Sequence, residues 1–172
     1  MGQMMKRVLS VLVAMAVTAV VHAAPLTGLY QTIDDKTNTP KSVVQIYEYT
    51  DGDGVKVAGR IVALYGADGQ ISETLAAPVK VADKVSGAPK YVGLDIIWGM
   101  EWDADDNRYE DGKIMDPQSG KVYSSVMWMD TPGALNVRGK IGPFGRTQNW
   151  RALDASAMPK IDTKNWTPSI RK

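Results

Sequence analysis

The chain has 172 residues, of which 44% are hydrophobic, with 20 basic residues, 19 acidic residues, one histidine and no cysteine. This near balance of charge excludes a general electrostatic attraction to nucleic acid or to anionic lipid. Without cysteine the fold has no disulfide, so a hydrophobic core alone must hold it. A chain of this length predicts one domain.

The first 23 residues are predicted to be a signal peptide. Lys6 and Arg7 precede an uncharged run over 8–21, and the Val-His-Ala sequence at 21–23 offers a cleavage site. An uncleaved membrane anchor is disfavoured, because a helix over 8–21 would reach only about 21 Å across a bilayer core of about 30 Å. We therefore expect cleavage after Ala23, export to the periplasm and no membrane span in the mature chain.

Cleavage changes the chemistry as well as the length. It removes Lys6, Arg7 and His22, so 18 of the 20 basic residues remain against 19 acidic ones, and the mature net charge is −1. The mature chain then has neither histidine nor cysteine, which argues against thiol enzymes, histidine triads and zinc enzymes. No cofactor and no metal site are predicted.

The mature chain alternates apolar and polar residues with the two-residue period of β-strands. Val57, Gly59 and Ile61, for example, share one face of such a segment. Gly, Pro and Asp mark reversals at 51–54, 116–120 and 130–133. The expected strands are Gly28–Ile33, Ser42–Tyr49, Val55–Ala63, Tyr91–Met100, Tyr109–Met115, Lys121–Met129, Leu135–Ile141 and Gly145–Leu153.

About eight strands that follow one another through short turns predict an all-β fold, a single antiparallel up-and-down (meander) β-barrel. Closure into a barrel removes the two exposed sheet edges. The barrel domain is expected to span residues 24–153. A lid or a short helix is expected near Ser72–Ala77, and 154–172 is expected to be an irregular tail that packs outside or is mobile.

Several short motifs in a set order resemble those of a known bacterial family. They include Gly28-Leu29-Tyr30, Trp98-Gly99-Met100, Asp111-Gly112-Lys113-Ile114 and Gly145-Arg146-Thr147-Gln148-Asn149-Trp150. In order and spacing they resemble the family called domain of unknown function 2147. The resemblance implies an exported protein with a lipocalin-like β-barrel, and it implies no particular activity. The chain departs from the family at Tyr30, where tryptophan is usual, and by its tail beyond Leu153.

Aromatic residues on separate strands form the strongest candidate for a ligand site. Val126 and Trp128 share one face of their strand, which is expected to point inward. In a small eight-stranded barrel, such inward residues either fill the interior or line a pocket for one small ligand. The candidate ligand-binding residues are Tyr30, Val57, Ile61, Trp98, Val126, Trp128, Arg146 and Trp150.

Arg146 is the candidate polar anchor of that set. It shares a strand face with Gln148 and Trp150, and an inward arginine is costly without a partner. It is therefore expected either to stack on an aromatic ring, with Tyr30 as the suggested partner, or to meet an anionic group of a ligand.

Carboxylates are the remaining candidates for chemistry. Asp95 interrupts an otherwise apolar segment and is the most suggestive titratable position, although a structural role, in which it accepts backbone hydrogen bonds at the barrel rim, is favoured. The acidic run from Asp103 to Asn107 does not fit a helix–loop–helix calcium site, and a solvated acidic hairpin is favoured over a looser oxygen-ligand site. Counted from Asp103, its sixth and twelfth positions are Arg108 and Ile114, where glycine and glutamate are needed.

The sequence therefore predicts a non-enzymatic, periplasmic, lipocalin-like protein that binds a small, mostly apolar ligand in its barrel. An envelope structural or protein-interaction module with a filled barrel is the first alternative, and a carboxylate-dependent hydrolase is the second. Both a monomer and a homodimer are compatible with the sequence, and nucleic acid is not expected as a partner.

Overall fold

The computed structural model describes residues 26–52 and 54–169, so the predicted signal peptide and its cleavage site lie outside the described residues. These ranges contain nine β-strands and one short 3₁₀ turn, Ala155–Ala157. The strands are β1 (Gly28–Ile33), β2 (Pro40–Asp51), β3 (Gly54–Tyr65), β4 (Ile71–Thr74), β5 (Asp95–Asp103), β6 (Arg108–Asp116), β7 (Lys121–Thr131), β8 (Ala134–Ile141) and β9 (Phe144–Leu153). Within the same ranges, no helix is long and apolar enough to cross a membrane.

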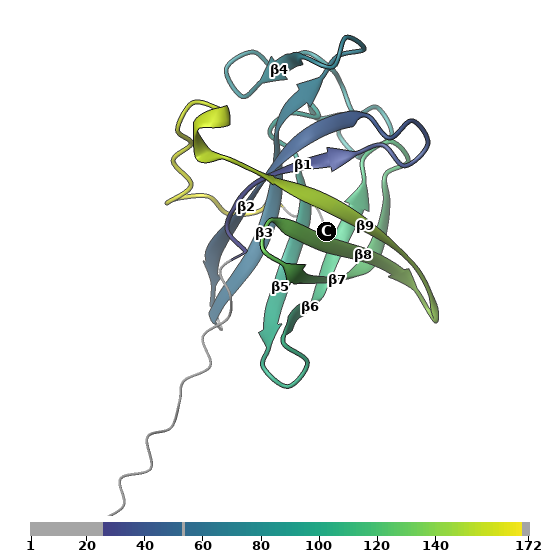
Figure 1. Cartoon of the computed structure of the whole chain (residues 1–172), viewed down its shortest axis with the longest axis vertical. Coiled ribbons are helices and arrows are strands. Elements are labelled where there is room, and N and C mark those ends of the chain that lie inside the picture. Colours follow the sequence, from purple (N-terminus) through teal and green to yellow (C-terminus); the bar gives the residue numbers. More distant parts are fainter. Residues whose placement is uncertain (1–25, 53, 170–172) are drawn as a thin grey trace, which may run out of the picture.

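Eight of the strands close into a ring (Figure 1). β1, β2 and β3 pair in sequence, β3 pairs with β5, and β5 to β9 follow in order, all antiparallel. β9 then returns to β1, where Tyr30 lies opposite Ala152. β4 pairs only with the end of β3 and stands outside the ring. The predicted all-β meander barrel of eight strands is confirmed.

β3 illustrates how alternation produces the barrel wall. Val57 and Ile61 are each 2% exposed and belong to the central core, whereas Arg60 lies on the opposite face. Gly59 stands between the two apolar residues because the wall is tight there. A Cβ at this position would lie 2.9 Å from Cδ1 of Ile46 on β2.

The segment between β3 and β5 differs from expectation. The helix considered near Ser72–Ala77 is absent, and strand β4 occupies its first half. Glu73 explains the local path, because its Oε2 accepts hydrogen bonds from the backbone N–H groups of Val79 and Lys80 and turns the chain back. The strand expected from Tyr91 begins only at Asp95. The loop before it sends Ala82, Val85 and Val92 into the core.

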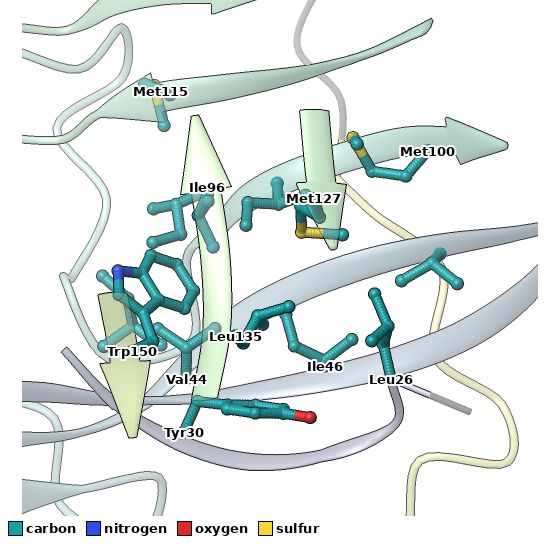
Figure 2. Close-up of a cluster of buried hydrophobic side chains, with 14 of the residues drawn as sticks. Leu26, Tyr30, Val44, Ile46, Ile96, Met100, Met115, Met127, Leu135 and Trp150 are labelled. Carbon is teal, nitrogen blue, oxygen red and sulfur yellow. The ribbon is translucent and has the colours of Figure 1, made fainter. Parts of the chain in front are cut away.

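Side chains from strands all around the ring meet in the barrel interior (Figure 2). Trp150 of β9, Leu135 of β8 and Met127 of β7 are at most 2% exposed, and Leu26, just before β1, joins the same cluster. The other large side chains that are fully buried in this cluster are Val44, Ile46, Val57, Ile97, Met100 and Val137. The described barrel is therefore filled by its own side chains.

The tail, residues 154–169, packs on the outside of the barrel against β1, β2 and β3 (yellow in Figure 1). Met158 is 8% exposed and contacts a buried outer cluster of Leu29, Val43, Val62 and Ala63. Ile161 and Trp166 extend the same contact. The tail is thus an ordered cover for an apolar part of the wall, although it lacks strand structure.

Candidate functional site

Half of the predicted ligand residues lie in the filled interior. Tyr30, Val57, Ile61 and Trp150 are each 2–3% exposed and belong to one core cluster. Burial raises the pKa of Tyr30 above its ordinary value. These four side chains are part of the packed core that holds the barrel together.

The inward orientation expected for Val126 and Trp128 is wrong. Met127, between them, is the residue that joins the core, while Val126 and Trp128 lie on the outer face opposite Arg138 and Asn136 of β8. Alternation along β7 does not show which face is inward, because residues on both faces are apolar and buried at this point. Val126 is 4% exposed and Met127 is 0% exposed. A shift of one residue exchanges the two faces of a strand.

Trp98 lies at the edge of the core. β5 contains a bulge here, and Gly99 has a φ of 69°. Because the bulge interrupts the alternation of the strand, the fully buried residues are Ile97 and Met100, which are not two positions apart. Trp98 pairs in register with Lys113 of β6 and is only partly buried.

Arg146 does not stack on Tyr30. Its guanidinium forms an ion pair of 2.6 Å with Asp35, from the loop between β1 and β2, and the Arg146 side chain is 68% exposed. Gln148 Nε2 also donates to Asp35, and Trp150 Nε1 donates to Gln148 Oε1. The expected shared face of Arg146, Gln148 and Trp150 therefore exists, and it links the core to an exposed contact at one end of the barrel.

A cavity of about 420 Å³ opens on the outside of the barrel wall. It is called the outer-wall groove below and is lined by Asp106, Asn107, Arg108, Val126, Trp128, Met129, Asp130, Arg138 and Lys140. Its volume lies within the usual range for small-molecule sites, about 300–1,000 Å³. Two predicted ligand residues, Val126 and Trp128, are therefore beside a cavity, although not inside the barrel.

Two of the three cationic residues of the groove, Arg138 and Lys140, come from the polar face of β8, and the third, Arg108, begins β6. Arg138 and Lys140 alternate with the core residue Val137 and with Gly139, a pattern that is visible in the sequence. Their position beside Val126 follows only from the register of β7 and β8. Arg138 and Lys140 were not predicted as site residues, because Val126 was expected to face the interior.

Acidic side chains gather at the hairpin between β5 and β6. Carboxylate oxygens of Asp103, Asp106 and Glu110 lie within 4.8 Å of one another, and a second cavity of about 250 Å³ adjoins them. Arg108 pairs with Asp106 and with Glu110, in the latter case at 2.8 Å. Backbone N–H groups of Asp106 and Asp105 lower the pKa of Asp103. The guanidinium of Arg108 thus forms ion pairs with two of the three carboxylates of this cluster.

Asp95 is buried on the outer face and fully engaged. Its Oδ1 accepts from the Tyr47 hydroxyl at 2.7 Å and from Arg60 Nε at 2.9 Å. Its Oδ2 accepts from Arg60 Nη2 and from the backbone N–H and hydroxyl of Ser169. With Trp166 over Arg60, these residues form the Asp95 cluster. Asp95 is thus a hydrogen-bond acceptor, but the expected backbone donors are mostly replaced by side chains, because the Ser169 N–H is the single backbone donor among the described residues.

Ser125 is a buried polar residue within the interior wall. It is 1% exposed, and its hydroxyl has no hydrogen-bond partner among the described residues. Its register partners on the two neighbouring strands are Gly112 and Gly139. Met100 occupies the space beside Gly112, where a Cβ would collide with its sulfur. The absence of a side chain at Gly112 therefore makes room for the core residue Met100.

Comparisons with known proteins agree on the fold. The family described as an uncharacterized protein conserved in bacteria (DUF2147) matches residues 28–152. A solved structure, that of protein HP1028 from Helicobacter pylori, described as belonging to the lipocalin family, superposes with a TM-score of 0.59. The alignment has 19% identity and covers 77% of this chain and 86% of that chain, so the likeness concerns the fold. No curated protein gives a significant match.

Proposed function

This chain belongs to the DUF2147 family of bacterial proteins and has a lipocalin-like barrel, and from this premise we propose that it is an exported, non-enzymatic binding module. In this proposal the barrel is a filled scaffold, and recognition takes place on its outer wall. The observation that carries the proposal is the interior itself. Leu135, Met127 and Trp150 meet there at 0–2% exposure, and the two cavities described above lie outside this core.

The absence of enzymatic activity is supported by the state of the carboxylates. Both oxygens of Asp95 accept hydrogen bonds, and its side chain is 2% exposed beneath the tail. A general base must reach the proton that it abstracts, which Asp95 could do only after the tail had left. The acidic residues near Arg108 are likewise paired. These contacts disfavour the carboxylate-dependent hydrolase.

A small apolar ligand inside the barrel is the competing proposal. It is favoured by the lipocalin-like fold and by the unpartnered hydroxyl of Ser125. Such a ligand would have to displace core side chains such as Met127 and Leu135, and removing a packed leucine side chain costs about 2–5 kcal/mol. The filled barrel needs no such displacement.

An engineered cavity separates the two proposals. Leu135→Ala should open a space in the core, and such apolar cavities bind small apolar molecules. Methyl signals of Val44 and Val137 should shift on addition of benzene in this variant. In the unmodified mature protein, they should not respond saturably to benzene, octanol or farnesol. A saturable response of these core methyl groups in the unmodified protein would replace the filled scaffold with the barrel site.

Export is proposed on the basis of the basic, apolar and small-residue segments of residues 1–23. Intact-mass analysis of the periplasmic fraction should detect a chain that begins at Ala24. Full-length protein retained in the membrane fraction would contradict this part of the proposal.

A further inference from the structure

The outer-wall groove has an apolar side formed by β7. Val126 is 4% exposed and Trp128 is partly buried, and both belong to the outer face of the strand. Tryptophan offers a large, rigid contact surface at a low cost in conformational entropy. This side of the groove can therefore bury an apolar group of a ligand.

The adjoining side of the groove carries two cations. Arg138 lies opposite Val126 in the register of β7 and β8, and Lys140 lies opposite Ser124. Both side chains are partly buried, and neither forms an ion pair within the described residues. Partial burial of a cation without a carboxylate partner leaves its charge available to an anion.

Arg138 is held in place by its neighbours on β9. Its Nη1 donates to Thr147 Oγ1 at 3.2 Å, and its side chain crosses over Gly145. A Cβ at position 145 would lie 2.7 Å from Arg138 Nε, so a larger residue there would push the guanidinium away. The cation is thus pre-positioned, which lowers the entropic cost of binding.

The acidic residues of the groove are already engaged. Asp106 pairs with Arg108, and Asp130 Oδ2 accepts a hydrogen bond from Asn136 Nδ2 at 3.0 Å. Arg108 is in turn shared between Asp106 and Glu110. The hydrogen bond from Asn136 leaves the negative charge of Asp130 in place, so the lining carries three cations, Arg108, Arg138 and Lys140, against two carboxylates. Of these cations, Arg138 and Lys140 form no ion pair within the described residues and remain for an anion.

We propose that the outer-wall groove binds a small amphiphilic anion, with the acidic group at Arg138 and Lys140 and the apolar part along Val126 and Trp128. This inference rests on the proposed function, because it assigns a ligand class to the outer wall of the filled barrel. The groove is open to solvent, so affinity is modest, and high salt weakens it by screening the two cations.

A matched series of eight-carbon probes tests the proposal on the mature protein. Octanoate, octanol and octylammonium share an apolar chain and differ in charge. Binding is followed through the indole N–H signal of Trp128 in ¹H–¹⁵N spectra, assigned with Trp128→Phe. Octanoate should shift this signal saturably, octanol should bind about tenfold more weakly, and octylammonium should bind more weakly still.

Three variants locate the site. Arg138→Gln combined with Lys140→Gln should weaken octanoate binding about tenfold and leave octanol binding unchanged. Gly145→Ala keeps every charge but displaces the guanidinium, and it should weaken octanoate binding selectively. Trp128→Ala should weaken both probes, as judged by the Arg138 Nε–H signal. Arg151→Gln and Phe144→Ala are the controls, because both residues are exposed and lie outside the groove.

The outcomes separate this inference from the proposed function. If octanoate does not bind, or if the three probes bind equally, the groove is not an anion site and the filled barrel still stands. If octanoate instead shifts the core methyl groups of Val44 and Val137, the proposed function fails, and the inference fails with it. Equal weakening by Arg151→Gln would also overturn the inference, because the effect would then come from net charge.

Discussion

The guanidinium carbon of Arg60 lies 4.3 Å from the centre of the Trp166 ring, which covers it from the outside of the barrel. Trp166 also meets Tyr47 edge to face, with 5.1 Å between ring centres. Beneath them Arg60 forms a salt bridge with Asp95, and its Nη2 donates to the backbone oxygen of Thr167. The tail is thereby tied to β2, β3 and β5 by stacking and by hydrogen bonds.

Trp166→Ala should destabilise the protein by about 2 kcal/mol, because it removes both a cation–π contact and an aromatic pair. Urea unfolding followed by far-UV circular dichroism measures the change in the free energy of unfolding. Trp166→Phe keeps a ring over Arg60 and should lose about half as much. Equal stability of the alanine variant and the unmodified protein would mean that the tail does not brace the barrel.

Asp95→Asn should cost more, about 3 kcal/mol, because it leaves the largely buried guanidinium of Arg60 without its carboxylate. Arg60→Met combined with Asp95→Asn should cost less than the sum of the two single changes, since neither charge then stays unpaired. The same urea experiments, arranged as a double-mutant cycle, give this coupling. Strictly additive costs would show that the two side chains act independently.

Stability should fall as the pH rises above about 10. Burial, followed by the hydrogen bond to Asp95, raises the pKa of Tyr47 well above its ordinary value of 10.0. The folded protein therefore keeps a proton that the unfolded chain loses in this range, and the free energy of unfolding declines with pH. Urea unfolding from pH 8 to pH 11 measures the slope. Tyr47→Phe should make it shallower, whereas an unchanged slope would assign the effect to other buried tyrosines such as Tyr30 and Tyr109.

Arg146→Gln should change stability little, by about 0.5 kcal/mol or less, although its ion pair with Asp35 is short. The Arg146 side chain is 68% exposed, so water and salt screen the pair, unlike that of Arg60 and Asp95. Unfolding in low and high salt tests the contrast. A loss as large as that of Asp95→Asn would show that the contact among Arg146, Asp35 and Gln148 closes the barrel end.

The candidate site was only partly predictable. Tyr30, Val57, Ile61 and Trp150 lie in the interior core cluster, although the sequence neighbours Leu29 and Val62 are apolar too and are buried on the opposite face. For Val126 and Trp128 the expected face was wrong, since Val126 and Met127 are both buried and alternation cannot choose between them. Arg138 and Lys140 were visible as the polar face of β8, but the sequence could not indicate which residues of β7 lie beside them.

The sequence by itself determined the fold class, the approximate positions of seven of the eight barrel strands and the lack of histidine and cysteine in the predicted mature chain. These are local properties, carried by a two-residue period, by turn residues and by composition. Only the tertiary structure decided which residues share a site. Asp95, Arg60 and Trp166 are far apart in the chain, and the outer-wall groove unites the β5–β6 hairpin with β7 and β8. Such contacts depend on strand register and on the path of the tail, which result from packing over the whole barrel.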